Sequence, residues 1–341
     1  MLVLDMVNIY SPTGSEGELV DFLVNWANKN GFKAYKDEVG NFIAEKGEQS
    51  EKNKKEILMV GHVDTVAGNI PVKVKDGKLY GRGSVDAKAP LACFLEAASK
   101  FDNDNCRLVV VGAIDEEGES KGARNILGKY SPDYIIVGEP SGWSNMNIGY
   151  KGSINLFYNA KQDKEHSSRS SMNCNERAVM FFNELRAYFE DFNQEKNLFN
   201  QLGIKLISIN SNDDGFNESV EMKINIRIPV GFDIEQLKNF VEQKKDDAAV
   251  DYSRFEKPVK AGKDNKLVSG FIKAIREAGG EPKFKLRTGT SDMNILQDYD
   301  VPIVTYGPGD ASLEHTPDEC LDLEEYDKSV RIMSSVLQQL M

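Results

Sequence analysis

The sequence predicts an α/β fold with a largely parallel sheet, and two observations support that prediction. Short apolar runs without alternation occur at 56–60 (EILMV), 106–115 and 133–139, and such runs are typical of strands buried on both faces. Helical patterns alternate with them, as at 90–101, and this order builds a parallel sheet covered by helices. Because 341 residues are too many for one average domain, a second domain is expected as well.

The first elements of the chain can be assigned from their end signals. A helix is predicted over 15–31, because Ser15 and Glu18 have the spacing of a capping box and a glycine ends the apolar face. Residues 34–47 are predicted to form a hairpin that turns at Gly40. The buried strand at 56–60 follows, so helical and strand patterns alternate from the N-terminus onward.

From about residue 152 the pattern changes, which indicates an inserted domain. Strands are expected there at 152–161, 204–211, 219–229 and 249–259, and helices at 175–192 and 233–244. The order βαββαβ is typical of a ferredoxin-like sandwich. A helix at 266–280 and a buried strand at 301–309 then resume the first pattern. We therefore expect a first domain built from 1–151 and 261–341, with a lid and dimerisation domain at 152–260 between them.

Composition excludes several classes of protein. The net charge of -12 argues against a nucleic-acid partner. The sequence contains no run of eighteen or more apolar residues, the length needed to span a membrane, and its N-terminal segment lacks the pattern of a signal peptide. A cytoplasmic protein is therefore expected. The four cysteines are scattered without a CxxC pair, which is typical of reduced thiols in the cytosol.

Acidic and imidazole side chains follow three of the predicted strands, at the point where each strand ends. His62 follows the strand at 56–60, Glu116 and Glu117 follow the next apolar run, and Glu139 follows the third. In open α/β sheets the carboxyl ends of the strands form the binding crevice. Because the same kind of residue recurs at the same kind of position, the sequence predicts a site at this edge of the sheet.

The residue types at these positions favour metal-assisted hydrolysis. A bound metal ion lowers the pKa of water to roughly 7, and a separate acid or base must move the proton. Five side chains are candidate ligands: His62, Asp86, Glu117, Glu139 and His315. Asp64 could accept the other ring N–H of His62. Asp86, in a glycine-rich turn before a helix, could reach between two ions, and of the adjacent Glu116 and Glu117 one could remain a base.

Each of these residues also has a plain structural explanation when it is taken alone. His62 and His315 could be loop or surface histidines, and Asp86 could be an ordinary acid at a helix N-terminus. The stretch 115–120 could be a solvated loop, and Glu139 a turn acid before a proline. Their recurrence in one pattern favours the metal site over these separate explanations.

The ordered motifs GHVDTV, GRGSVDAKAPLA, DEEGESKGA, GEP, EHSS and GPGDASLEHTPDE resemble those of the M20 family of zinc amidohydrolases. The resemblance covers nearly the whole chain and implies a three-layer zinc-peptidase-like catalytic domain with an inserted ferredoxin-like lid. It implies that one zinc ion is held by His62 and Glu139. A second zinc ion would be held by Glu117 and His315, with Asp86 bridging the two. Cobalt could replace zinc.

The same resemblance assigns the remaining roles. Glu116 would be the general base, and Asp64 would orient His62. In the inserted domain, His166 would donate to the developing oxyanion, often across the interface of a homodimer, although the glycine that the family places before this histidine is absent from AKQDKEH. The residues expected to hold a substrate carboxylate or carbonyl are Arg227, Arg287, Gly289, Thr290 and Ser291.

Shorter phrases, VGEPSGW, IGYKGSI, TGTSDMN and YGPGD, resemble the lysine- and ornithine-forming branch of the family. The resemblance implies hydrolysis of an amide on the side-chain nitrogen of lysine or ornithine. The acyl part of that amide would be either a small acyl group or an acidic amino-group carrier protein. A chain with a net charge of -12 would repel an acidic carrier protein. Either a basic patch near Lys151, Arg169 and Arg287 binds the carrier, or the substrate is a small molecule.

Other functions stay open at this point. The same chemistry could act on succinyl-diaminopimelate, on acetylornithine or on a dipeptide. A dinucleotide-binding fold is suggested by YGRGSVD, but Asp86 replaces the third glycine of that fingerprint. A binding protein without turnover would keep the lid and pocket, yet no expected ligand or base is missing.

Overall fold

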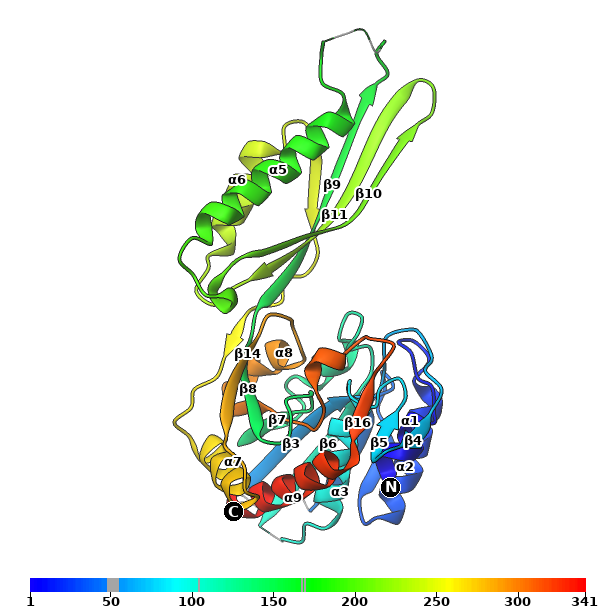
Figure 1. Cartoon of the computed structure of the whole chain (residues 1–341), viewed down its shortest axis with the longest axis vertical. Coiled ribbons are helices and arrows are strands. Elements are labelled where there is room, and N and C mark those ends of the chain that lie inside the picture. Colours follow the sequence, from blue (N-terminus) through cyan, green and yellow to red (C-terminus); the bar gives the residue numbers. More distant parts are fainter. Residues whose placement is uncertain (48–54, 104, 167, 169) are drawn as a thin grey trace. The chain divides into compact units, whose positions relative to one another are not determined.

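A computed structural model describes residues 1–47, 55–103, 105–166, 168 and 170–341. The chain divides into two compact units (Figure 1). The first unit comprises Met1–Gly149, Ala261–Leu286 and Ser291–Met341, and the second comprises Tyr150–Lys260 and Arg287–Thr290. The second unit is thus inserted into the sequence of the first. Its action as a lid stays a prediction.

The main sheet of the first unit has the order β1-β2-β6-β3-β7-β15-β8 in the part of the chain that the structure describes. These strands are β1 (Lys33–Lys36), β2 (Phe42–Lys46), β6 (Cys106–Ala113), β3 (Lys55–His62), β7 (Tyr134–Val137), β15 (Ile303–Thr305) and β8 (Asn145–Tyr150), and β14 (Lys283–Arg287) pairs with β8. The pairs β3–β6, β3–β7 and β7–β15 are parallel. The predicted α/β fold with a largely parallel sheet is therefore confirmed.

The register of the central strands brings their carboxyl ends to one edge of the sheet. His62 at the end of β3 pairs with Ala113 at the end of β6, and Val60 pairs with Val137 at the end of β7. These three strands are buried almost throughout, as their unbroken apolar runs predict. The polar residues that follow β3, β6 and β7 consequently emerge side by side.

Helices cover both faces of this sheet. They are α1 (Leu2–Val7), α2 (Gly17–Lys29), α3 (Lys88–Ser99), α4 (Lys121–Ile126), α7 (Lys266–Glu277), α8 (Met293–Leu296) and α9 (Leu323–Gln339), with short 3-10 turns at Gln297–Tyr299 and Ala311–Leu313. Alternate strand residues such as Ile57 and Met59 join the core formed with α3, α7 and α9. The helices α4 and α8 contact β6 and β15, and their buried side chains lie outside that core, so they cover the other face.

Of two local features predicted near the N-terminus, one differs in the structure and the other is confirmed. The helix expected from Ser15 begins instead at Gly17, with Glu16 at the N-cap and no side-chain capping bond, so the predicted capping box is wrong. The carboxylate of Glu16 accepts the N–H of Gly14, which tightens the turn before the helix. The hairpin is confirmed, since the carboxylate of Asp37 accepts the N–H of Gly40 within its turn.

A small second sheet of the first unit was not predicted. It has the order β16-β5-β4, with β16 (Cys320–Asp322), β5 (Lys78–Tyr80) and β4 (Lys73–Lys75). Strands of three residues are too short to give a clear alternating pattern. This sheet matters for the site, because β5 leads into the turn that carries Asp86 and β16 follows the segment that carries His315.

The second unit is an α+β sandwich. It contains β9 (Gly152–Asp163), α5 (Cys174–Phe192), a 3-10 turn (Leu198–Asn200), β10 (Gly203–Asp213), β11 (Asn217–Ile228), α6 (Ile234–Lys244) and β12 (Ala249–Tyr252), and β13 (Val259–Lys260) ends its continuous segment. The sheet order is β10-β11-β9-β12, all antiparallel. Both helices lie on one face of this sheet (Figure 1). The predicted ferredoxin-like βαββαβ order is confirmed.

Two further findings bear on the class of protein. No helix within the described ranges is long and apolar enough to cross a bilayer. The four cysteines are all free, and three of them, Cys93, Cys106 and Cys174, are buried.

Candidate functional site

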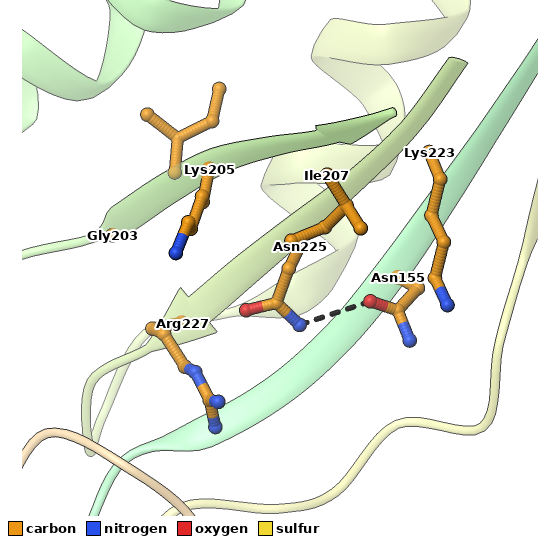
Figure 2. Close-up of a pocket in the computed structure, with 8 residues that line it drawn as sticks. Asn155, Gly203, Lys205, Ile207, Lys223, Asn225 and Arg227 are labelled. Carbon is orange, nitrogen blue, oxygen red and sulfur yellow. Dashed lines mark hydrogen bonds between the residues drawn. The ribbon is translucent and has the colours of Figure 1, made fainter. Parts of the chain in front are cut away.

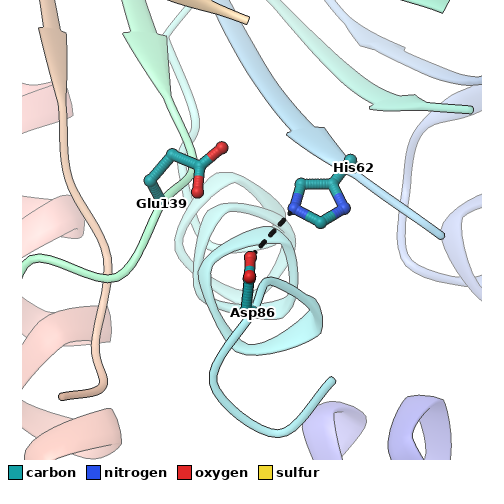
Figure 3. Close-up of side chains that lie close together, drawn as sticks. All are labelled: His62, Asp86 and Glu139. Carbon is teal, nitrogen blue, oxygen red and sulfur yellow. Dashed lines mark hydrogen bonds and ion pairs between the residues drawn. The ribbon is translucent and has the colours of Figure 1, made fainter. Parts of the chain in front are cut away.

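Two groups of potential metal ligands meet in the first unit. His62, Asp86 and Glu139 form one group (Figure 3), and Asp86, Glu117 and His315 form the other. Within each group the ligand atoms lie within 4.8 Å of one another. Because Asp86 belongs to both groups, the five residues form one continuous cluster with a shared carboxylate at its centre.

The contacts around Asp86 describe this cluster. One carboxylate oxygen of Asp86, Oδ1, lies 3.2 Å from Nε2 of His62, and the other, Oδ2, lies 3.0 Å from Nε2 of His315. The same nitrogen of His315 lies 3.0 Å from Oε1 of Glu117. Each oxygen of this one carboxylate therefore faces a different imidazole, so Asp86 could contact ions held in either group.

The fold explains how residues so distant in sequence meet. His62 is the last residue of β3, Glu117 follows β6, and Glu139 follows β7, all at the same edge of the sheet. Asp86 lies in the turn just before α3, and His315 lies in the loop before β16, where its backbone has a left-handed φ of 61°. Histidine is among the non-glycine residues that adopt this conformation more often than most.

The site concentrates more buried negative charge than its surroundings balance. Burial raises the pKa of Glu116 and of Glu139 well above the ordinary value, and neighbouring carboxylates add to the effect. Burial would also raise the pKa of Asp86, but its contacts with His315 and His62 lower it. Burial would lower the pKa of His62, yet the Asp64 and Asp86 carboxylates raise it well above the ordinary value.

This donor set fits a pair of divalent cations. Imidazole and carboxylate groups are the ligands that zinc and similar ions take in hydrolases, and a cation would relieve the repulsion among the buried acids. His315 is the most exposed member, with 52% of its side chain accessible, so the second group opens toward solvent. An accessible position beside the ligands is what a catalytic site requires.

Asp64 contacts both His62 and the loop that carries the two glutamates, and its role in orienting His62 stays a prediction. Its carboxylate lies 3.5 Å from Nδ1 of His62, longer than a good hydrogen bond, while its main-chain carbonyl oxygen lies 2.9 Å from that nitrogen. The same carboxylate accepts the backbone N–H groups of Glu116 and Glu117, each at 3.1 Å, and the hydroxyl of Thr13 at 2.8 Å. Asp64 therefore links the ring of His62 to the loop that presents the two glutamates.

Sequence reasoning missed a further acid of this site, Asp292. Its side chain is 2% exposed, and its Oδ1 has no hydrogen-bond partner among the described residues. Burial raises its pKa to about 7, and the negative charge of Asp292 in turn raises the pKa of both Glu116 and Glu139. The phrase TGTSDMN contains this residue, but nothing in the phrase distinguishes an acid that faces the site from a surface acid.

Two of the predicted substrate-binding residues meet in the second unit. A guanidinium nitrogen of Arg227 donates to the hydroxyl of Thr290 at 3.0 Å. The carbonyl of Arg287 accepts the N–H of Lys151, which holds the start of the same turn, and Gly289 lies within it. These contacts bring a charged donor and a hydroxyl group together, as a carboxylate-binding site would need.

The remaining two predicted site residues, Ser291 and His166, form hydrogen bonds with other partners. Ser291 belongs to the first unit and is buried, and its hydroxyl oxygen accepts the N–H of Met293 at the start of α8. His166 lies between β9 and α5 in the second unit, exposed, with Nδ1 2.9 Å from the hydroxyl of Ser168. Arg169 of the predicted basic patch lies outside the described residues.

The open face of the second unit's sheet carries a groove next to Arg227 (Figure 2). The groove has a volume of about 470 Å³ and is lined by Asn155, Gly203, Ile204, Lys205, Ile207, Lys223, Asn225 and Arg227. The Asn225 amide donates to the Asn155 amide oxygen at 3.0 Å. Three cationic side chains and two amides without an acid among them suit an anionic group.

Comparison with known proteins adds to this geometry. Residues 58–339 match the model of peptidase family M20/M25/M40. The chain is 35% identical over 351 residues to a LysW-lysine hydrolase of Deinococcus radiodurans, covering 99% of this chain and 96% of the relative. It is 30% identical over 344 residues to a LysW-lysine/LysW-ornithine hydrolase of Saccharolobus islandicus, covering 99% of this chain and 95% of the relative.

A solved structure shares the fold. An M20 family metallo-carboxypeptidase from Sulfolobus solfataricus superposes with a TM-score of 0.79 at 16% sequence identity, over 99% of this chain and 98% of that one. At this identity the likeness concerns the architecture alone.

Proposed function

Because the chain belongs to peptidase family M20/M25/M40, we propose that its cluster of five ligands holds two metal ions and that it releases lysine or ornithine from a carrier protein. The family and the hydrolase names of its relatives make the chain a metal-dependent amidohydrolase. The observation that carries the two-metal proposal is the shared Asp86, whose two carboxylate oxygens each face a different histidine.

The proposed ligand roles follow this geometry. His62 and Glu139 would hold one ion, Glu117 and His315 the other, and Asp86 would bridge them. We propose zinc as the metal, with cobalt as an alternative, because imidazole and carboxylate donors in threes suit both. When bound, such ions polarise a carbonyl oxygen and lower the pKa of water to roughly 7.

Glu116 is the proposed general base. It is adjacent to a proposed ligand but belongs to neither group, and the Asp64 carboxylate holds its backbone N–H. A buried acid with a raised pKa can take a proton from water and return it to the leaving amine near neutral pH. Asp64 would keep Glu116 and Glu117 in place, because one carboxylate accepts the N–H of both.

The second unit would recognise the substrate. Arg227 and Thr290 are the proposed carboxylate-binding pair, supported by Arg287, Gly289 and the groove beside Arg227. A guanidinium can hold a carboxylate through two parallel hydrogen bonds, and a neighbouring hydroxyl can donate a further one. Ser291 remains a proposed backbone or hydroxyl contact. We further propose that His166 donates to the oxyanion and that the protein acts as a homodimer.

The substrate assignment draws on the names of the two relatives, both of which act on a lysine or ornithine joined to LysW. Succinyl-diaminopimelate, acetylornithine and dipeptides would need the same hydrolytic centre, so the cluster alone does not choose among them. The near-complete coverage of both relatives favours the carrier-linked substrate.

A side-by-side assay tests this proposal. Release of free amino acid would be measured from carrier-linked lysine, carrier-linked ornithine, acetylornithine, succinyl-diaminopimelate and a dipeptide, all with zinc or cobalt. We expect kcat/KM to be highest for a carrier-linked amino acid. Turnover of one of the others at a kcat/KM tenfold higher would reassign the substrate and leave the two-metal chemistry in place.

A further inference from the structure

Glu319 is a buried acid near the proposed metal centre, and the proposed mechanism gives it no role. It is fully buried, in the segment between His315 and β16. Its Oε1 accepts the backbone N–H of Val85 at 2.9 Å and that of Asp86 at 3.1 Å. Its Oε2 accepts from the guanidinium of Arg82 at 2.7 Å. Both oxygens are therefore engaged, and one of them holds the main chain of Asp86 itself.

Arg82 extends the connection to two further backbone carbonyls. Its Nε donates to the carbonyl of Gly68 at 3.0 Å, and the nitrogen that binds Glu319 also donates to the carbonyl of Thr316 at 3.2 Å. Thr316 directly follows His315. One buried ion pair thus joins the turn that carries Asp86 to the segment that carries His315.

The backbone around this pair leaves the turn little freedom. Gly81 donates its N–H to the Glu319 carbonyl at 3.4 Å, next to the β5–β16 pairing of Tyr80 with Cys320. Gly83 has a φ of 83°, and a Cβ there would lie 3.0 Å from the side chain of Lys88. Lys88 is itself fully buried and donates to the carbonyl of Ile9 at 2.6 Å.

The position of Asp86 matters more than that of any other proposed ligand, because it alone belongs to both groups. A displacement of its carboxylate would change the coordination of two ions at once. Groups that hold metal ligands in place typically change metal affinity or activity by about 10–100-fold when they are removed. The buried pair is suited to this task, since a guanidinium and a carboxylate joined in a fixed direction define an orientation as well as a distance.

We propose that Glu319, together with Arg82, is a positioning residue that fixes the spacing between Asp86 and His315 for both metal ions. This role rests on the proposed two-metal function and deepens it. It differs from a purely structural role, in which the pair would stabilise the fold without changing the affinity of the site for metal.

A matched control is available in the same unit. Glu56 also pairs with a largely buried arginine, Arg107, and its Oε1 accepts the backbone N–H of Ser131 at 2.8 Å. Glu56 lies at the start of β3, whereas the metal centre lies at the end of that strand. Glu319→Gln and Glu56→Gln therefore break the same kind of buried pair at opposite ends of the sheet.

The test measures zinc binding to both variants and to the unchanged chain. The affinity and stoichiometry for zinc would be measured by competition with a chromophoric chelator, alongside the Tm of the metal-free proteins. We expect both variants to lower the Tm, and Glu319→Gln alone to weaken zinc binding by about 10–100-fold. Its kcat should fall while KM changes less than twofold. Zinc affinities within twofold of each other in the two variants would overturn the positioning role.

Arg82→Lys keeps the test informative if Glu319→Gln does not fold. A lysine can preserve the charge opposite Glu319 but cannot also donate to Gly68 and Thr316 in the same geometry. Because this change is conservative, we expect a smaller loss of zinc affinity, about threefold to tenfold. That loss is at or below the lower end of the range of about 10–100-fold that is typical of groups that support metal ligands. An unchanged affinity would contradict the proposal. A wild-type chain that binds no zinc would instead overturn the two-metal function itself.

Discussion

Two clusters of buried charge lie at opposite ends of the same central strands, and they differ in balance. At the start of β3 and β6, Arg107 lies between Glu45 and Glu56, with a guanidinium nitrogen 3.1 Å from the Glu45 carboxylate. At the other end, six acids face two histidines: Asp64, Asp86, Glu116, Glu117, Glu139 and Asp292 against His62 and His315.

The difference between the two ends separates a structural ion cluster from a functional one. Buried charges normally occur with partners, because an unpaired buried charge costs several kcal/mol. The arginine end largely meets this rule within the protein. At the histidine end burial raises the pKa of Glu116, Glu139 and Asp292, and this excess of buried acids is the physical reason to expect metal there.

Glu116→Gln removes the proposed base and leaves the five ligands in place. Loss of a general base typically costs about 10²–10⁴-fold in rate, so kcat for release of lysine from its carrier should fall by that factor. Zinc stoichiometry should stay at two ions per chain, measured on the same preparation. A kcat within threefold of the unchanged chain would remove Glu116 from the mechanism.

His315→Ala leaves the second group with two carboxylates only. Zinc stoichiometry should fall from two ions to one, as measured by metal analysis after gel filtration, and turnover should fall with it. If two ions remain tightly bound in this variant, His315 is not a ligand.

Zinc uptake should also release protons. The contacts with Asp86 and Glu117 raise the pKa of His315 to about 10 in the metal-free chain, so this imidazole carries a proton at neutral pH. A metal ligand must be deprotonated, so zinc affinity should rise as the pH increases from 6 toward 9, by about tenfold per unit where one proton is displaced. Titration in two buffers of different ionisation enthalpy would count the protons, and a count of zero would contradict the expectation.

Glu56→Gln should affect stability without affecting chemistry. Breaking a buried pair by removing one partner costs about 3 kcal/mol in free energy of unfolding, and Glu45 is then the remaining carboxylate partner of Arg107 among the described residues. Urea unfolding of the metal-free protein measures the loss. The kcat for lysine release, measured well below the Tm, should match that of the unchanged chain within twofold. A large loss of kcat in a folded variant would erase the contrast between the two ends.

The smallest effect is expected from an exposed pair, Glu38 and Lys129. The hydrogen bond from Lys129 lowers the pKa of Glu38 from 4.5 to about 2. A carboxyl with a depressed pKa contributes stability above its unfolded value, and this contribution is lost as the pH falls through the folded value. The Tm difference between the unchanged chain and Glu38→Gln should therefore shrink from pH 4.5 to pH 2. A difference that grows toward low pH would contradict this sign.

The fold was largely predictable because its central strands are unambiguous in the sequence. Apolar runs such as ILMV at 57–60 are typical of strands buried on both faces, and polar residues at their ends mark the edge where the site forms. The alternation of Lys223, Asn225 and Arg227 with apolar residues is also visible in the sequence, and these three side chains line the groove on one face of β11. Periodic patterns of this kind depend on near neighbours, which a sequence displays directly.

The parts that could not be predicted depend on contacts between distant segments. Glu319 meets Arg82 across 237 positions, and no local pattern indicates that pairing. The Asp64 carboxylate was expected to contact the ring of His62, but in the folded loop it also accepts the N–H groups of Glu116 and Glu117, which follow it by more than fifty residues. The capping box predicted at Ser15 rests on a local sequence signal, but the turn at Gly14, closed by Glu16, prevents it from forming.

The most direct test of the two-metal account is a zinc titration of activity. Metal-free protein would receive zinc in steps of a fraction of an equivalent, and the rate of lysine release from its carrier would be measured at each step. If turnover requires two ions, the rate should be near zero without metal and reach a plateau close to two equivalents of zinc per chain. A rate that does not depend on zinc, or a folded protein that holds two ions and releases no amino acid from any substrate named above, would contradict the two-metal account.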